Sequence, residues 1–167
     1  VILPLLRGYE MAFEKVKESL KGTELESKII ECKESSATVE LAAKALNTEP
    51  DRIAKTLSFL IEDKPVLIVV SGMSKIDNHK YKDFFHRKAK MIPFEEVEKY
   101  IGHAPGGVCP FAVNADVDVY LDESLKQYEI VYPAAGSGNT AVETTIAQLE
   151  KYSGYKQWVD VSKKIEQ

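Results

Sequence analysis

Two runs of apolar residues near the middle of the chain predict the clearest regular structure. Residues 56–61 and 66–71 are separated only by the polar turn at 62–65, which predicts an antiparallel hairpin. The second run is apolar at five successive positions, 66–70. A strand that alternates polar and apolar residues keeps one face in water, whereas an unbroken apolar strand has both faces covered. We therefore expect this strand at the centre of a sheet.

Helical spacing of apolar residues predicts helices around the hairpin. Residues 39–46 place four apolar side chains on one face, behind the N-cap candidate Thr38. Thr145 and Gln148 form a capping box that opens a helix ending near Gly154. Further helices are expected at residues 11–20, 77–87 and 93–100, and further strands at 28–32, 90–92, 117–121, 128–132, 141–144 and 158–161. This mixture predicts a single α+β domain with a mixed, largely antiparallel sheet and surrounding helices.

We assign this domain to residues 11–167. Residues 1–10 are expected to be an N-terminal extension of vector or upstream origin, because the chain starts with Val and its apolar opening is interrupted by Pro4. That opening lacks the basic leader and the cleavage site of a signal peptide. No apolar run is long enough to cross a bilayer, so we expect no membrane association.

Composition and charge narrow the function classes. The 167 residues are 44% hydrophobic and 29% charged, which is ordinary for a soluble globular protein. The net charge of −4 argues against nonspecific binding along a nucleic-acid backbone, DNA included, but is compatible with a local basic patch. Residues 75–90 are the most basic region. Cys32 and Cys109 are expected to be reduced thiols in a cytoplasmic protein.

Residues 102–111, with the sequence GHAPGGVCPF, are the stretch best suited to chemistry. Three glycines and two prolines within ten residues predict a rigid, exposed loop. The N–H groups from Gly106 through Cys109 can then point outward and bind an oxygen atom. An ordinary tight connection has the same composition, so the loop alone does not define a site.

Cys109 in this loop is a candidate nucleophile, with His103 close in sequence. A thiol hydrolase needs the thiolate, activated by a base or by a helix N-terminus. The sequence does not fix His103 against Cys109 in space, and a small residue that happens to be cysteine explains the pattern more simply. His79 and His86 can share a helix face but lack a third ligand, so we predict no metal site.

Two further features are weak signals when taken alone. Lys55 stands where a polar turn becomes an apolar strand, so its ammonium group either reaches water or holds an anionic ligand. Residues 136–140, GSGNT, form a second small-residue loop that lacks the lysine of a P-loop. This loop can still offer N–H and hydroxyl groups to a polar ligand.

Four stretches occur together in the order and approximate spacing of one protein family. They are residues 38–43 (TVELAA), 53–57 (IAKTL), 106–111 (GGVCPF) and 135–140 (AGSGNT). The pattern resembles the YbaK/EbsC family, which includes the editing domain inserted in bacterial prolyl-tRNA synthetases and its free-standing relatives. The similarity runs from about Met11 to the C-terminus and implies an α+β fold with a barrel-like sheet.

The resemblance implies a trans-editing aminoacyl-tRNA deacylase that needs no metal, cofactor or covalent nucleophile. Its substrate is the 3′ CCA end of a mischarged tRNA, a tRNA for proline or a related one, carrying a small or medium amino acid. A synthetase or an elongation factor is a further expected partner. Lys55 is expected to hold the substrate end, while Gly106 and Gly107 offer N–H groups to the ester carbonyl. The remaining expected pocket residues are Thr38, Ser71, Val108, Cys109, Pro110, Gly136, Ser137, Gly138 and Asn139.

Two departures from the family pattern bear on the substrate. Cys109 occupies a position that relatives more often fill with Ser, Pro or another residue, and the loop at 136–140 differs from the shorter glycine turn of YbaK proper. The identity of the amino acid is therefore not carried over from any one subfamily. Two other hypotheses stay open: a noncatalytic module that binds tRNA ends or nucleotides on the same scaffold, and a thiol hydrolase that depends on Cys109.

Overall fold

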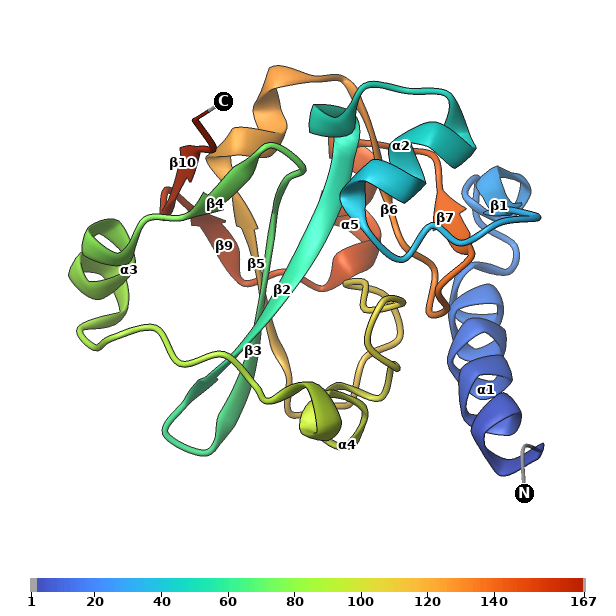
Figure 1. Cartoon of the computed structure of the whole chain (residues 1–167), viewed down its shortest axis with the longest axis horizontal. Coiled ribbons are helices and arrows are strands. Elements are labelled where there is room, and N and C mark those ends of the chain that lie inside the picture. Colours follow the sequence, from blue (N-terminus) through green and yellow to red (C-terminus); the bar gives the residue numbers. More distant parts are fainter. Residues whose placement is uncertain (1–2, 167) are drawn as a thin grey trace.

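A long antiparallel hairpin forms the centre of the molecule, as the sequence predicts (Figure 1). The computed structural model describes residues 3–166, with side chains described from Ala12 onward. The hairpin consists of β2 (Ile53–Ile61) and β3 (Lys64–Ser71). The two strands pair from Ala54 opposite Ser71 to Ile61 opposite Lys64.

The hairpin belongs to a six-stranded sheet with the strand order β8-β6-β2-β3-β5-β9. The other strands are β5 (Asp118–Asp122), β6 (Ile130–Pro133), β8 (Thr144–Thr145) and β9 (Gln157–Val159). Strands β2–β3 and β6–β8 pair antiparallel, whereas β2–β6, β3–β5 and β5–β9 pair parallel. The sheet is mixed, as predicted, but antiparallel pairs are less dominant than expected. The parallel pairs join strands that are far apart in sequence, and local patterns do not predict such pairs.

Two small antiparallel sheets complete the strand structure. One pairs β1 (Ile29–Glu31) with β7 (Thr140–Val142), and the other pairs β4 (Ser74–Ile76) with β10 (Ser162–Lys164). The predicted strand at 90–92 is reduced to a single bridge between Met91 and Phe59. The predicted strand at 158–161 is divided between β9 and the segment that leads into β10.

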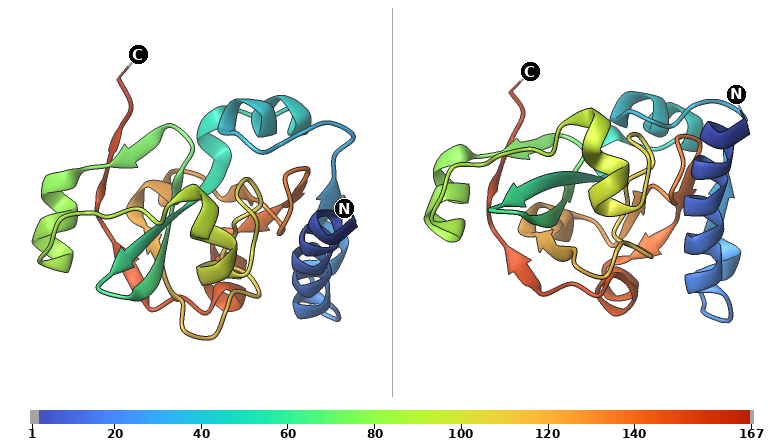
Figure 2. Two further views of the ribbon diagram at one scale, coloured as in Figure 1. Left: turned by 60° about the horizontal axis from the view of Figure 1, so that its bottom comes forward. Right: turned by 90° about the horizontal axis from the view of Figure 1, so that it is seen from below.

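Five α-helices surround the strands within the described residues: α1 (Leu3–Leu20), α2 (Val39–Leu46), α3 (Asn78–Phe85), α4 (Val97–Ile101) and α5 (Ile146–Ser153). Helix α1 starts before the predicted residue Met11. The helix predicted at 93–100 is a 3₁₀ turn, Phe94–Glu96, followed by α4. Further 3₁₀ turns lie at Glu26–Lys28, Pro50–Arg52 and Glu123–Gln127. Helices α1 and α3 lie at opposite ends of the molecule (Figure 2).

The predicted helix caps are confirmed. The Thr38 hydroxyl accepts the N–H of Leu41 at 3.2 Å at the start of α2. Thr145 and Gln148 form the reciprocal capping box of α5, and Gly154 ends that helix with φ at 65°. Such caps satisfy N–H and carbonyl groups that have no partner within the helix itself.

Strand β3 is covered on both faces, as its unbroken apolar run predicts. Leu67 and Val69 point into the larger core cluster, which includes side chains of α1, α4 and α5. Val66, Ile68 and Val70 point the other way and pack with α3 in a second cluster. The sheet curls into a half-barrel around the larger cluster, and the chain is a single-domain α+β protein.

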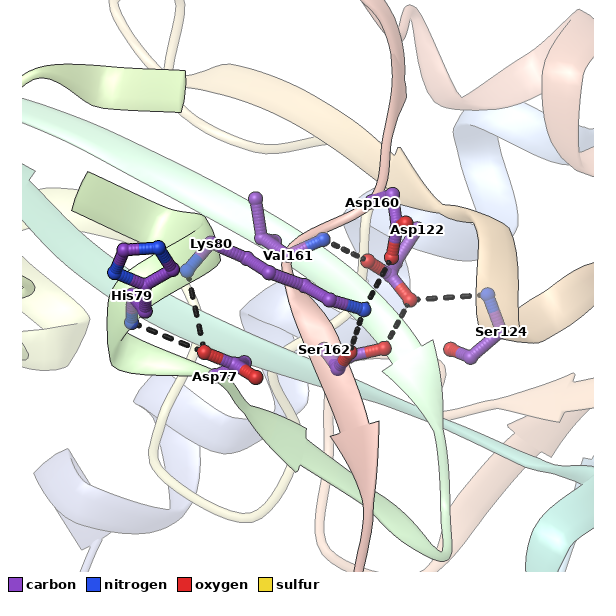
Figure 3. A network of polar contacts seen from close by, with 8 residues as sticks. All are labelled: Asp77, His79, Lys80, Asp122, Ser124, Asp160, Val161 and Ser162. Atoms are coloured by element: carbon purple, nitrogen blue, oxygen red, sulfur yellow. Dashed lines mark hydrogen bonds and ion pairs between the residues drawn. The ribbon is translucent and has the colours of Figure 1, made fainter. Parts of the chain in front are cut away.

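The C-terminal strand is fixed to the sheet through a buried carboxylate at the end of β5 (Figure 3). Asp122 is fully buried and accepts the backbone N–H groups of Val161 at 2.9 Å and Ser124 at 3.0 Å. It also accepts the Ser162 hydroxyl at 2.5 Å. Because a buried carboxylate needs hydrogen-bond donors to offset the loss of water, these bonds make the docking of the C-terminal segment specific.

Candidate active site

The sheet splits between β2 and β6, and a cavity of about 330 Å³ lies at this opening. Strand β6 pairs with β2 only at Ile53 and Ala54. Farther along, β2 regains a neighbour where Phe59 bridges to Met91. Between these two points the outer edge of β2 borders the cavity.

The cavity walls come from segments that are distant in sequence. Residues 53–58 of β2 lie along it, α2 contributes Val39, Ala42 and Leu46, and the glycine loop contributes Pro105, Gly106 and Val108. The loop before α2 adds residues 36–38. The apolar face of α2 thus faces both a small core cluster and the cavity. Apolar walls with a few polar groups are typical of small-molecule sites.

Lys55 lies in the stretch of β2 that has lost its β6 neighbour, and it lines the cavity. Its side chain is half-buried, and burial lowers the pKa of its ammonium group, with a smaller opposing effect of Glu40 and Asp51. No carboxylate of the described residues lies within ion-pair distance of Lys55, and no other charged residue lines the cavity. A cation in this position attracts an anionic or strongly polar ligand group.

The glycine loop offers two free N–H groups, a smaller set than the sequence predicts. Gly106 has a φ of +91°, and the N–H of Gly107 closes a turn by donating to Ala104 at 3.0 Å. The N–H of Cys109 donates to His103 Nδ1 at 3.3 Å. Among the described residues, Gly106 and Val108 have no acceptor for their N–H groups, and both line the cavity. The turn uses the Gly107 N–H in this structure, and the contact of that N–H with a ligand stays a prediction.

The second small-residue loop supports the first, and of its five residues Thr140 alone lines the cavity. The Gly136 N–H donates to the Gly107 carbonyl at 3.0 Å. The carbonyls of Gly138 and Asn139 accept the N–H groups of Ser36 at 2.8 Å and Cys32 at 2.7 Å. None of the residues 136–139 is part of the cavity wall, and their contact with a ligand stays a prediction. The Ser137 hydroxyl bonds Asn139 and Thr140 instead.

A comparison with protein families decides what kind of domain carries this site. The model of the family described as "Aminoacyl-tRNA editing domain" matches residues 33–152, which include Lys55, both loops and α2. The chain belongs to the aminoacyl-tRNA editing domain family.

Relatives of this editing domain are similar over most of the chain. YwhH of Bacillus subtilis (strain 168), an uncharacterized protein, is 44% identical over 154 residues, covering 92% of this chain and 98% of YwhH. EbsC of Enterococcus faecalis, named as a proposed Cys-tRNA(Pro)/Cys-tRNA(Cys) deacylase, is 29% identical over 113 residues, covering 66% of this chain and 68% of EbsC. A crystal structure described as a proposed trans-editing enzyme for prolyl-tRNA synthetase superposes with a TM-score of 0.81 at 29% identity, covering 91% of this chain and 97% of that one.

Three other predicted pocket residues of the editing domain lie away from the cavity. Ser71 is fully buried at the end of β3, where its hydroxyl lies 2.7 Å from that of Ser74. Cys109 and Pro110 are buried in the glycine loop, behind the part that forms the wall. Of the predicted residues, Lys55, Gly106, Thr38 and Val108 do line the cavity. Burial of the others follows from long-range packing, which the motif positions alone do not show.

Cys109 and His103 form a neutral pair inside the core. The thiol Sγ lies 3.8 Å from His103 Nδ1, and both residues have no exposed surface. Burial raises the pKa of the Cys109 thiol to about 12 and lowers the pKa of His103 to about 4. Because Nδ1 accepts the Cys109 N–H, the imidazole proton lies on Nε2, 3.3 Å from the Ala112 carbonyl. A thiol without exposed surface is not reachable by a substrate in the cavity, which argues against the thiol-hydrolase hypothesis.

The basic region at residues 75–90 is partly neutralised. Lys80 Nζ lies 3.0 Å from the carboxylate of Asp160 (Figure 3), and Arg87 pairs with Glu62 at 3.5 Å. The exposed lysines with no ion pair among the described residues are Lys75, Lys82, Lys88 and Lys90. Lys90 precedes Met91, which lines the cavity. The available positive charge therefore continues from α3 toward the site.

The histidines of α3 have local roles. His79 Nε2 lies 3.3 Å from Asp83, and His86 ends the helix in a left-handed conformation with φ at 60°. Across residues 12–166, no three His, Cys, Asp or Glu side chains are close enough together to hold a metal ion. No helix within residues 3–166 has the length and apolar character to cross a membrane.

Sequence reasoning missed two polar residues of the cavity wall, Ser36 and Thr56. No local sequence pattern marks Ser36 as a site residue, and Thr56 lies within a predicted strand. Both hydroxyls are buried and without a hydrogen-bond partner among the described residues. The alternation of side chains in β2 places Thr56 on the opposite face from Lys55, and the Thr56 hydroxyl has no access to solvent.

Proposed function

We propose that this chain is a free-standing aminoacyl-tRNA deacylase, which hydrolyses the ester between a wrong amino acid and the 3′-terminal adenosine of a tRNA. One observation carries the proposal: Lys55 and the free N–H groups of Gly106 and Val108 line the same cavity. Family membership supports the same reaction class.

The two free N–H groups are suited to stabilise the transition state. Water attacks the ester carbonyl carbon, and the carbonyl oxygen becomes an oxyanion that accepts hydrogen bonds from Gly106 and Val108. The intermediate then collapses, the ribose oxygen leaves with a proton, and the products are the free amino acid and the tRNA. One donor of this kind commonly lowers the activation free energy by about 3 kcal/mol.

The described lining residues include no Asp, Glu, His or Cys that can act as a general base. A neighbouring ribose hydroxyl of the substrate is therefore the proposed acceptor for the proton of the attacking water. An aminoacyl ester is already activated, so orientation and oxyanion stabilisation supply much of the acceleration.

Lys55 is proposed to hold a phosphate or carbonyl oxygen at the tRNA end. Its ammonium group is half-buried, so its attraction for an anion is less screened than that of a surface lysine. The exposed lysines Lys75, Lys82, Lys88 and Lys90 are proposed to contact the RNA backbone outside the cavity. The names of EbsC and of the trans-editing structure support tRNA for proline as the tRNA. A synthetase or an elongation factor as a partner, and action in the cytoplasm, are further parts of this proposal.

The direct test is a panel of proline tRNAs carrying Ala, Cys, Ser, Thr or Pro, with release of each amino acid measured at equal enzyme concentration. We expect at least one mischarged tRNA to be hydrolysed well above the buffer rate, while correctly charged prolyl-tRNA persists. Tight binding of the panel without any hydrolysis would instead favour the noncatalytic module.

A further inference from the structure

A large aromatic side chain stands in solvent beside the cavity. Phe94 is 76% exposed and Met91 is 57% exposed, the two highest values among the large apolar side chains of residues 12–166. Met91 belongs to the cavity wall, whereas the Phe94 ring lies outside it. The ring has no aromatic partner among the same residues. Exposed apolar surface next to a cavity is typical of an interaction site.

The backbone on both sides of Phe94 is fixed, so the ring is held out in solvent by ordered structure. Before it, the Ile92 N–H donates to the Ser58 carbonyl of β2 at 3.1 Å, and the Ile92 side chain is buried. After it, the Val97 N–H donates to the Phe94 carbonyl, and Val97 is buried in the larger core cluster. An aromatic ring on a fixed backbone loses little entropy when it binds a ligand.

The chain around Phe94 follows the rim of the cavity. Met91 and Val97, three residues before and three residues after Phe94, both line the cavity. Three residues of extended chain span at most about 11 Å, so the Cα atom of Phe94 lies within that distance of two wall residues. We call residues 91–97 the rim segment. A ligand that fills the cavity and leaves it over this segment meets the Phe94 ring.

The charges around the rim segment favour a nucleic-acid base, not a phosphate, as the partner of the ring. Glu95 and Glu98 are exposed carboxylates close to Phe94 in the chain, and they repel a phosphate but not an uncharged base. Lys88 and Lys90, just before the rim segment, are exposed and have no ion pair among the described residues. Aromatic rings that stack with bases, next to lysines that attract phosphates, are the usual means of binding single-stranded nucleic acid.

We propose that the Phe94 ring stacks on the adenine of the 3′-terminal adenosine when the aminoacyl ester occupies the cavity. The inference rests on the proposed deacylase function for the identity of the ligand. The ester is attached to the ribose of this adenosine, so its base is the first group of the tRNA that emerges from the cavity. Met91 supplies further exposed apolar surface beside the base. Single-stranded RNA ends are commonly recognised by such stacking on aromatic side chains.

Binding of two RNA hairpins tests this contact. Both carry the acceptor-stem sequence of a proline tRNA and a 5′ fluorescent label; one ends in CCA, and the other lacks only the terminal base. Both are uncharged, so the result does not depend on which amino acid is the substrate. Fluorescence anisotropy gives the Kd of each complex. We expect the wild type to bind the CCA hairpin about tenfold more tightly than the hairpin without the base.

The variants assign this difference to one ring. Phe94→Ala should reduce the ratio of the two Kd values toward one, whereas Phe94→Trp, which keeps an aromatic face, should retain it. Phe84→Ala is the matched control, because it removes another exposed aromatic ring, from α3 outside the cavity wall. Its ratio should equal that of the wild type. Because Phe94 is exposed, its variants should unfold at the wild-type temperature.

A ratio near one for the wild type would overturn the base contact. A ratio that Phe94→Ala leaves unchanged would also overturn it, and a protein partner would then explain the exposed ring better. Base-dependent binding through Phe94 without hydrolysis of any aminoacyl-tRNA would overturn the deacylase function and leave the base contact standing.

Discussion

The carbonyl oxygen of Gly107 accepts the backbone N–H of Gly136 at 3.0 Å, and this bond joins the two small-residue loops. The contact is so close that a Cβ atom on Gly107 would lie 2.5 Å from the backbone nitrogen of Ser137. One loop presents N–H groups to the cavity, and the other supports it from behind. The glycine at 107 is therefore required by packing between two backbones, and its own N–H is used within a turn.

Replacing Gly107 by alanine should destabilise the protein by roughly 1–3 kcal/mol, because the new methyl group meets backbone that cannot move aside cheaply. Urea unfolding monitored by circular dichroism measures the change. Gly138→Ala is the control, since a Cβ there meets only the Ala37 methyl at 3.6 Å, an ordinary contact. Equal stability of the two variants would contradict the close-packing argument.

Lys55→Met should lower kcat/KM for deacylation about 10–100-fold, the value of one hydrogen bond from a charged donor. The same variant should keep or raise the melting temperature, because burial already disfavours the ammonium form and lowers the pKa of Lys55. Loss of activity without loss of stability separates a substrate contact from a structural role.

The matched control for this variant is Lys64→Ala, which removes a surface lysine that pairs with Asp118 at 3.4 Å. Its activity should equal that of the wild type, because Lys64 is not part of the cavity wall. If Lys55→Met retains full activity while folded, Lys55 has no part in the reaction.

The buried thiol of Cys109 should resist alkylation in the native protein. Iodoacetamide is expected to modify Cys32, which is partly exposed, while Cys109 reacts only after unfolding. Mass spectrometry of the digested protein distinguishes the two sites. Cys109→Ser should retain deacylation, because its side chain lies outside the cavity wall. Rapid native labelling of Cys109 together with inactivation would restore the nucleophile hypothesis.

His103 should make stability depend on pH between neutral and mildly acidic conditions. Burial lowers its pKa from 6.5 to about 4, so the unfolded chain binds the proton first as the pH falls. The contribution of neutral His103 to the free energy of unfolding is fully present above pH 6.5. It is lost as the pH falls to 4, and the total loss is about 3 kcal/mol.

The comparison that isolates this effect is wild type against His103→Asn, whose amide does not titrate. Urea titrations at several pH values between 7 and 4 give the unfolding free energy of each protein. The difference between the two values should shrink by about 1.4 kcal/mol per pH unit below 6.5. Parallel pH curves for the two proteins would show that His103 is not buried in its neutral form.

Features that depend on neighbouring residues were predictable from the sequence. The β2–β3 hairpin follows from two apolar runs with a short turn, and the capping box of α5 follows from Thr145 and Gln148. Lys55 and Gly106 were identified through the family pattern, and both line the cavity.

Features that depend on distant segments were not predictable. The cavity exists because β6 stops pairing with β2 after Ala54, and no local pattern records where a parallel partner ends. Ser71 and Cys109 are turned into the interior by packing, which their positions in the sequence motifs do not record. The use of the Gly107 N–H within a turn likewise depends on the loop conformation.

The opening between β2 and β6 has a consequence for how this protein can change over evolutionary time. The cavity is held open by the path of the backbone, so its walls can exchange one side chain for another without rebuilding the frame. A lineage can therefore redirect such a chamber toward a new ligand through a few substitutions in its walls, at positions such as Val39 and Ala42. Adaptability of this kind suits a domain family whose members are found both alone and as part of larger enzymes.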